Sequence, residues 1–522
     1  MRLANGHIRI LSLLLVFYYV IAAWLFHRNG FEHTEALFYA EKLKLLYEYK
    51  ENTLLTLGTT FPTIVFLGSV IFSPFGYLFA PIALSIVMMS FLFYFMVIDL
   101  CNSSLPVKAL LIAVCLLFVF HPMFLYAAVS GRSIAAIMLF FYLLFRSLFN
   151  YYKSQTTYYL SLASIYLTCL IFTEINFIWM ILSFFPFVVL ISIEGIKVAK
   201  DDPMVLQYYQ ALNNRSQRRK LANRTIAIYL ILFLLPLGAV YLYRALNAAH
   251  AGDATYFLTS QYANWRVTGT TTLNTILENV KGRNIAKQTQ IVFQFFTMIL
   301  SPVFVLALFL FRGKIYELFT LLTPLIFFSI ILVDINYYIT VEYFMIINVI
   351  AVAGLAFLGK ERVNATVTSG LIIAAAVLSI SAGSYYFSET SDVEEQQFYQ
   401  SSAGPSTWNK PKINSEAAVL AEYLGTIASA KRPVLIDDAS AYGIVAHMAS
   451  LDGLVLPMQK SFVTAIENPT LSAHYICVAK KNNRLHNFTV LNAYNIGIMR
   501  DRIDLFPYRV FETENWIIYS IR

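Results

Sequence analysis

Apolar runs of about twenty residues dominate the chain, and a helix of that length crosses the hydrocarbon core of a bilayer. The runs fall near residues 8–27, 54–72, 77–98, 108–128, 133–150, 157–174, 177–195, 225–244, 290–311, 316–333, 340–358 and 366–386. Charged residues make up only 13% of the chain, whereas soluble domains carry about 25%. The sequence therefore predicts an α-helical polytopic membrane protein and excludes a soluble globular fold.

Lysine and arginine residues indicate how these runs cross the membrane, because they gather in cytoplasmic loops. Seven of the 38 Lys and Arg lie between Lys197 and Arg224, a segment that would lie outside if all twelve runs crossed. Segment 54–72 contains Gly58 and Pro62, a composition that suits a surface-lying or re-entrant piece. We therefore expect about 11 transmembrane helices plus in-plane helices, with a cytoplasmic N-terminus.

The net charge of +8 does not indicate nucleic-acid binding, since the densest basic segment lies between two apolar runs, where it reports topology. The cysteines, Cys101, Cys115, Cys169 and Cys477, show no paired spacing. That pattern favours neither a disulfide framework nor a zinc cluster.

The composition changes after residue 387. Residues 388–412 are polar and contain two prolines, so we expect a linker there. Residues 413–522 then alternate helical and strand patterns, which predicts a small α/β domain. The expected helices are 415–429, 441–449 and 460–466, and the expected strands are 433–438, 474–479, 508–512 and 516–521. We accordingly divide the chain into a transmembrane domain (1–387), a linker and an extracytoplasmic α/β domain.

Acidic residues gather directly after the first apolar run, at Glu32 and Glu35, with His33 between them. A helix over Glu35–Leu46 would have one apolar side, which predicts that it lies along the membrane surface. Its polar residues, expected on a wetter side, are Glu41, Lys42 and Lys44. Acids at this boundary are well placed to activate an acceptor beside a lipid-borne donor.

Three motifs follow one another along the chain: the acidic stretch Glu32–Ala40, the pair Phe61-Pro62, and His121–Tyr126 followed by Ser130–Ser133. Their order resembles the GT-C superfamily of membrane glycosyltransferases. That group includes oligosaccharyltransferases, protein O-mannosyltransferases and the aminoarabinose transferases of lipid A. The resemblance covers roughly residues 1–390 and implies a GT-C-like fold in a bacterial cytoplasmic (inner) membrane.

The resemblance implies transfer of a sugar from a polyprenyl-phosphate or polyprenyl-diphosphate lipid to a glycan, lipid or protein acceptor on the outer face. In the inverting version a carboxylate takes the acceptor proton. Glu35 is our first candidate for this base and Glu32 the second. The family commonly has Asp-Glu in the first loop, where this chain has Thr34-Glu35, and an acid in the second outer turn, where it has Arg132.

Further candidates for substrate binding lie in the expected outer loops. The leaving phosphate needs cationic groups, and the candidates are Arg132, Arg266, Arg283 and Lys287. Boundary residues that we expect to contact substrate are Glu174, Asp334 and Tyr337. His121 is expected to be a hydrogen-bonded structural residue. We assign no metal ligand, although a divalent cation held by Glu32, His33 and Glu35 stays open.

Two other classes of function remain open. The departures from the family pattern favour a catalytically degenerate scaffold with the same fold, which would contact partner subunits of an envelope complex. The third alternative is a polysaccharide polymerase or flippase-like protein. Transporters more often carry ionisable residues or broken helices at mid-bilayer, whereas the polar residues here gather at one face.

Overall fold

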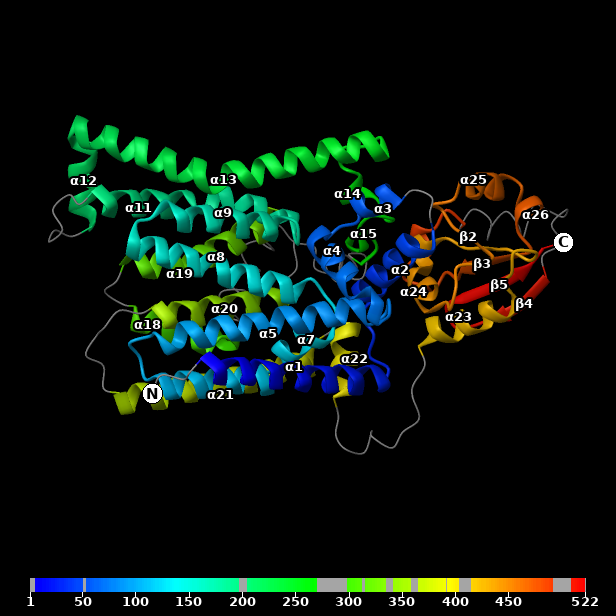
Figure 1. The fold of residues 1–522 in the computed structure, drawn as a ribbon, viewed down its shortest axis with the longest axis horizontal. Helices are drawn as coiled ribbons and strands as arrows, with labels where there is room; N and C mark the ends of the chain where they lie inside the picture. The colour runs from blue at the N-terminus through cyan, green and yellow to red at the C-terminus, as the bar shows by residue number, and fades with distance from the viewer. Residues whose placement is uncertain are drawn as a thin grey trace.

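The computed structural model describes residues 5–49, 53–196, 204–269, 298–311, 315–334, 341–357, 365–390, 392–402, 415–491 and 508–521. A helical bundle forms one part of the molecule and a small sheet with helices forms the other (Figure 1). The bundle elements are α1 (Asn5–Arg28), α5 (Ala80–Cys101), α6 (Val107–Phe120), α7 (Pro122–Val129), α8 (Ile134–Ser154), α9 (Thr157–Ile171), η2 (Ile175–Trp179), α10 (Met180–Ser183), α11 (Phe185–Ile196), α12 (Met204–Asn213), α13 (Arg215–Ala251), α18 (Pro302–Leu310), α19 (Ile315–Asp334), α20 (Val341–Phe357) and α21 (Ala365–Glu389).

Within the described residues, five helices are long and apolar enough to cross a membrane: Gly6–Arg28, Ala80–Cys101, Ile134–Ser154, Arg215–Ala251 and Ala365–Glu389. Two bent pairs, Val107–Phe120 with Pro122–Val129 and Ile175–Ser183 with Phe185–Ile193, would raise that number to seven. Shorter apolar helices are Thr63–Phe75, Thr157–Ile171, Leu318–Phe328 and Phe344–Phe357. The expected membrane bundle is present, and the number of eleven spans stays a prediction.

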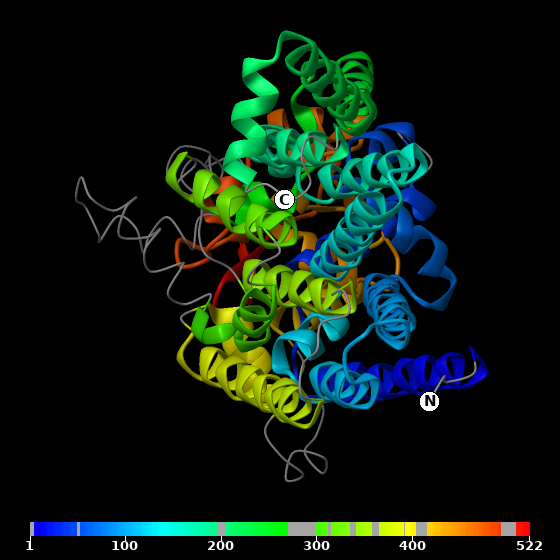
Figure 2. The same cartoon turned by 90° about the vertical axis from the view of Figure 1, so that its left-hand side faces the viewer.

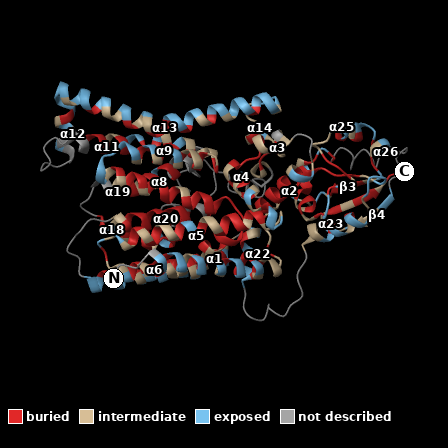
Figure 3. Cartoon of the chain, viewed as in Figure 1, coloured by how far each residue is buried: buried red, intermediate tan, exposed pale blue. Residues whose placement is uncertain are grey.

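The outer surface of the bundle is apolar, as lipid requires. Leu234 and Tyr241 on α13 are 67% and 73% exposed, and Figure 3 shows exposed residues along most of this helix. In the view of Figure 2, α13 and α21 lie at opposite margins of the bundle. The buried core lies between them, largely on α5, α7, α8 and α20.

The expected span 108–128 is broken at His121, where α6 and α7 meet at 58°. Pro122 begins α7, and the His121 Nδ1 accepts a hydrogen bond from the Met123 N–H at 3.2 Å. The other ring nitrogen lies 3.2 Å from the Ser379 hydroxyl on α21. The imidazole is fully buried, and its two hydrogen bonds hold the chain at the bend. His121 is thus a hydrogen-bonded structural residue, as expected.

Short helices occupy the end of the bundle that faces the sheet. They are α2 (Thr34–Glu48), α3 (Thr53–Thr59), α4 (Thr63–Phe72), η1 (Ser73–Phe75), α14 (Tyr256–Thr259), α15 (Trp265–Gly269) and α22 (Val393–Ser401). Segment 54–72 forms α3 and α4 with a break between them rather than one straight helix.

Part of the expected linker 388–412 is ordered structure, which corrects the sequence prediction. Residues 393–401 form α22, and Asp392 caps it by accepting hydrogen bonds from the N–H groups of Glu394 and Glu395. Phe398 is 1% exposed and stacks on Phe26 at 4.8 Å between ring centroids. The polar composition of residues 388–412 gave no indication that Phe398 would be buried. Residues 403–414 lie outside the described part of the chain.

The C-terminal residues form a five-stranded sheet in the order β2-β1-β3-β5-β4. Its elements are α23 (Glu416–Ile427), β1 (Val434–Leu435), α24 (Asp438–His447), β2 (Leu454–Val455), α25 (Lys460–Glu467), α26 (Pro469–Ser472), β3 (Tyr475–Ala479), η4 (His486–Phe488), β4 (Tyr508–Glu512) and β5 (Trp516–Ser520). Strand β1 runs parallel to β2 and β3, and β5 runs antiparallel to β3 and β4. The expected α/β pattern is present, with β2 as an additional short strand.

Helix α2 lies between the bundle and the sheet domain (Figure 1). Leu45 of α2 belongs to the core of the sheet domain. Conversely, Tyr442 of α24 packs among the apolar residues around α2, with its ring 6.0 Å from that of Phe38. Residues of α2 and α24 therefore join the bundle and the sheet domain through continuous apolar packing.

The expected wetter side of α2 is buried, which is a second correction. Glu41, Lys42 and Lys44 are each at most 4% exposed. The Lys42 ammonium lies 3.0 Å from Glu41 and 3.2 Å from Asp438 of α24. The sheet domain covers the polar side of the amphipathic helix, and the buried charges are paired as low dielectric requires.

Lys44 fixes the C-terminal end of α24. Its ammonium donates hydrogen bonds to the backbone carbonyl oxygens of Val445, Ala446 and Met448. These carbonyls lie at the end of the helix, where the last C=O groups have no partner inside the helix and a cation is favoured.

We predict that Lys44→Met loosens the docking of the sheet domain on α2. The change leaves buried carbonyl oxygens unpaired, at a cost on the order of 1–3 kcal/mol. Amide hydrogen exchange in α24 should therefore become about tenfold faster or more in the full-length protein. Lys460→Met, at an exposed residue of α25, is the matched control, and equal exchange in both variants would contradict the assignment.

Candidate functional site

The Glu35 carboxylate is the centre of a buried polar cluster at the end of the bundle. It is fully buried and accepts hydrogen bonds from the Ser133 N–H at 2.9 Å and the Tyr39 hydroxyl at 2.8 Å. The Arg132 Nε donates to its second oxygen at 3.3 Å. Burial raises the pKa of Glu35, but the charges of Arg132, His33 and Arg266 and the hydrogen bond from Ser133 together hold the pKa below its usual range.

A close approach of two segments makes these contacts. Gly131 adopts a φ of 70°, and a Cβ there would lie 2.9 Å from the Cβ of Ala36 on α2. Glycine is therefore required at this position, both for the backbone conformation and for the space. The turn 130–133 therefore packs directly on the first turn of α2.

Two arginines lie close to the Trp265 ring. The guanidinium carbons of Arg132 and Arg266 are 6.0 Å and 5.8 Å from its centroid. Arg266 forms an ion pair with Glu174, whose carboxylate also accepts from the Asn176 side chain at 2.9 Å. The structure thus brings Glu35, Arg132, Glu174 and Arg266 together, although they come from four separate segments.

His33 connects the loop between α1 and α2 to α22. Its Nδ1 accepts a hydrogen bond from the Glu35 N–H at 3.1 Å, which caps α2. Its Nε2 lies 2.7 Å from a carboxylate oxygen of Glu394. Burial raises the pKa of Glu394, but the charge and hydrogen bond of His33 lower it to about 2. Glu394 also accepts from the Thr34 N–H at 3.3 Å.

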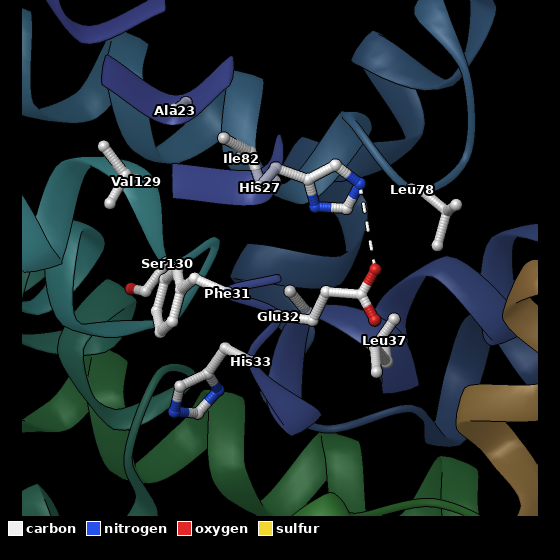
Figure 4. Close-up of a pocket in the computed structure, with 11 residues that line it drawn as sticks. Ala23, His27, Phe31, Glu32, His33, Leu37, Leu78, Ile82, Val129 and Ser130 are labelled. Atoms are coloured by element: carbon white, nitrogen blue, oxygen red, sulfur yellow. Dashed lines mark ion pairs between the residues drawn. The ribbon is translucent and has the colours of Figure 1, made fainter. Parts of the chain in front are cut away.

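Glu32 differs from Glu35 because it lines a pocket that is partly open to solvent (Figure 4). The pocket lies between the end of α1, the start of α2, the start of α5 and the α7–α8 turn. Its lining residues are Ala23, His27, Phe31, Glu32, His33, Ala36, Leu37, Leu78, Ile82, Val129 and Ser130. The Glu32 side chain is 13% exposed, so it is the more accessible of the two predicted carboxylates.

The remaining predicted residues are not placed in this cluster. Arg283, Lys287 and Tyr337 lie outside the described residues, and Asp334 is the last residue of α19. Among the residues that the structure describes, no group of three His, Cys, Asp or Glu side chains is arranged to hold a metal ion. His33 and Glu35 in particular point to Glu394 and Arg132 rather than to a common point with Glu32.

Sequence reasoning missed two residues of this site. Glu394 and His447 reach the first outer loop from positions about 360 and 415 residues further along the chain. Neither belongs to a motif or to a regular spacing with Glu32 or His33. Only the helical nature of α22 and the docking of α24 on α2 bring them there.

No family model matches the chain, and no curated protein matches its sequence. Solved structures match its fold. ArnT from Cupriavidus metallidurans bound to undecaprenyl phosphate superposes with a TM-score of 0.52, at 10% identity, over 99% of this chain and 98% of that one. The apo form of ArnT gives 0.47, at 10% identity, over 97% of each chain.

The archaeal oligosaccharyltransferase AglB from Archaeoglobus fulgidus, in complex with an inhibitory peptide and a dolichol-phosphate, gives a TM-score of 0.38 at 12% identity. That match covers 89% of this chain and 69% of AglB. The superposition with undecaprenyl-phosphate-bound ArnT extends over nearly the whole of both chains. The chain therefore has a GT-C fold, which confirms the architecture expected from its three motifs.

We predict a stability change that depends on Glu395, the neighbour of Glu394. Burial raises its pKa to about 7, above about 4.3 in an unfolded chain. The protonated form therefore stabilises the fold below about pH 4.3, and this contribution is lost as the pH rises through 7. The loss is on the order of 3 kcal/mol at pH 8.

Glu395→Gln keeps the side chain neutral at every pH. The Tm of the wild-type protein in detergent should fall between pH 5 and 8, and the Tm of the variant should fall distinctly less. Glu389→Gln, at an exposed residue of α21, is the control and should behave as wild type. Parallel pH curves for the wild-type and Glu395→Gln proteins would refute the assignment.

Proposed function

We propose that this protein is a membrane glycosyltransferase that moves a sugar from a polyprenyl-phosphate or polyprenyl-diphosphate carrier to an acceptor on the outer face of the membrane. The observation that carries the proposal is the fold, which matches undecaprenyl-phosphate-bound ArnT over nearly the whole chain. Fold alone does not fix function. The proposal therefore also depends on the carboxylates and arginines that gather beside the pocket.

The arrangement of the chain supports an extracytoplasmic sheet domain. The N-terminus and the start of α13 lie at the end of the bundle opposite the sheet domain (Figure 1). That start carries Arg215, Arg218, Arg219, Lys220 and Arg224. Because basic residues mark the cytoplasmic side, this arrangement favours a cytoplasmic N-terminus and a candidate site on the outer face of a bacterial inner membrane.

Glu32 is the carboxylate best placed to act as the base. It lines the pocket, whereas Glu35 is buried and already accepts three hydrogen bonds. Burial raises the pKa of Glu32, but the hydrogen bond and charge of His447 lower it below the usual range. The carboxylate is therefore ionised at neutral pH, as a base must be.

In the proposed step an acceptor hydroxyl in the pocket gives its proton to Glu32. The hydroxyl oxygen forms a bond to the anomeric carbon of the sugar while the bond from that carbon to the carrier phosphate oxygen breaks. The electron pair of the broken bond stays on the phosphate. Arg132 and Arg266 are our candidates for neutralising this phosphate, because guanidinium groups bind phosphate oxygens through paired N–H donors.

A second candidate function is a non-catalytic scaffold with the same fold. The specific observation in its favour is the pairing of Arg132 with Glu35 and of Arg266 with Glu174. A phosphate would have to compete with these carboxylates for the guanidinium groups. Under this alternative the ion pairs serve only to hold the outer loops in place for contact with partner subunits.

We predict that Glu32→Gln lowers the transfer rate at least 100-fold, since general-base catalysis contributes roughly 10² to 10⁴. The assay uses full-length protein in lipid nanodiscs with a panel of polyprenyl-phosphate sugars and a membrane lipid extract as acceptor. Mass spectrometry measures the release of polyprenyl phosphate. Glu467→Gln, at an exposed residue of α25, should keep the wild-type rate.

Two results would count against parts of this proposal, the first against the role of Glu32 and the second against the enzyme. Release of polyprenyl phosphate at the wild-type rate by Glu32→Gln would remove Glu32 from the proposed step. No release from any donor by the wild-type protein, while the same preparation co-purifies with other membrane proteins, would favour the scaffold.

A further inference from the structure

Two imidazoles from different parts of the chain flank the Glu32 carboxylate. The His447 Nε2 lies 3.0 Å from Oε2 of Glu32, and the His27 Nε2 lies 3.7 Å from Oε1. His27 lies near the end of α1, and His447 is the last residue of α24 in the sheet domain. In Figure 4 the Glu32 carboxylate points toward the His27 ring across the pocket.

The contact with His447 is the closer and the more buried of the two. The His447 side chain is 8% exposed, whereas that of His27 is 33% exposed. The backbone around His447 is also fixed, because Lys44 donates to the carbonyl oxygens of Ala446 and Met448 on either side of it. The imidazole is therefore held in position by the docking of the sheet domain on α2.

We propose that His447 is a positioning residue for the acceptor site, and that the sheet domain thereby completes this site. This inference rests on the proposed function. His447 holds Oε2 of Glu32 by a hydrogen bond, whereas Oε1 has only the longer contact of 3.7 Å with His27 across the pocket. The hydrogen bond to Oε2 fixes the orientation of the carboxylate, and a fixed orientation is what general-base catalysis needs.

The chemistry of the pocket indicates which acceptors it suits. The lining combines Glu32 and His27 with apolar residues, Ala23, Ile82 and Val129 among them. The pocket lies at the end of the membrane-spanning α1. An amphipathic acceptor with a hydroxyl next to an apolar part fits this lining better than a fully polar glycan.

Among the described residues, the titratable group that contacts Glu32 besides His447 is His27 from α1. His33, the N-cap of α2, lines the same pocket but pairs with Glu394, and Lys44 of α2 donates to the carbonyl oxygens on either side of His447. The Ser415 hydroxyl at the start of α23 also hydrogen-bonds to Glu32 and lowers its pKa. Among these, His447 contributes the largest stabilisation of the ionised carboxylate, so its removal has a measurable signature at Glu32.

The test compares His447→Leu, His447→Gln and His474→Gln in the full-length protein. Leucine removes the hydrogen bond to Glu32, and glutamine keeps an N–H donor near the position of Nε2. His474 is exposed in the same domain, so His474→Gln is the matched control. Hydrogen exchange in α24 checks that each variant keeps the sheet domain docked.

The first measurement needs no enzyme activity. A hydrophobic carbodiimide labels protonated carboxyl groups, and peptide mass spectrometry gives the pH at which half of Glu32 is labelled. We expect His447→Leu to raise this pH by about one unit, because it removes a partner of the charged form. His447→Gln should give a smaller shift, and His474→Gln should give none.

The second measurement is the transfer rate and its pH dependence in the nanodisc assay, with an amphipathic alcohol as acceptor. We expect His447→Leu to lower kcat at least tenfold and to move the acidic limb of the profile upward, with His447→Gln restoring most of the rate. An unshifted labelling pH together with wild-type transfer in His447→Leu would overturn the positioning role. If His447→Leu shifts the labelling pH of Glu32 but the wild-type protein transfers no sugar, the proposed function alone would be overturned.

Discussion

The buried ion pair between Glu35 and Arg132 is the interaction on which the rest of the site depends. Two charges in a low-dielectric interior are costly unless each also has hydrogen bonds. Here the Ser133 N–H and the Tyr39 hydroxyl satisfy Glu35, and the Tyr126 hydroxyl accepts from Arg132 at 3.1 Å. The pair fixes the first turn of α2 against the α7–α8 turn. Glu32, three residues before Glu35, is thereby placed at the pocket.

Helix α2 contacts both the bundle and the sheet domain and so connects the Glu35–Arg132 pair to the sheet domain. Its apolar side packs on the bundle, and its polar side pairs with α24 through Lys42 and Lys44. A helix of this kind on a free membrane surface would expose those lysines to water. Because the sheet domain buries them here, its docking contributes to holding α2 in this position. The sheet domain is consequently part of the structure of the site rather than an appendage.

Sequence patterns predicted the features that depend on local composition. The membrane bundle, the alternating elements after residue 413 and the outer-loop acids all follow from hydropathy, period and charge. Sequence patterns gave wrong predictions where the environment of a residue depends on a contact with a residue far along the chain. Lys42 was expected to face water because its neighbours are polar, and Asp438, 396 residues away, pairs with it instead. Likewise, the expected linker contains the packed helix α22, because Phe398 stacks on Phe26 of α1.

The absence of an aspartate at position 34 has a structural counterpart. Thr34 stands where the GT-C enzymes that the sequence resembles commonly have Asp, and the Glu394 carboxylate from α22 lies 3.3 Å from its N–H. Three carboxylates in different surroundings therefore meet around the start of α2. Arg132 neutralises Glu35, His33 holds Glu394 with a pKa of about 2, and Glu32 alone of the three lines the pocket. In the proposed step the proton goes to Glu32, the carboxylate that lines the pocket. The missing aspartate by itself therefore does not argue against catalysis.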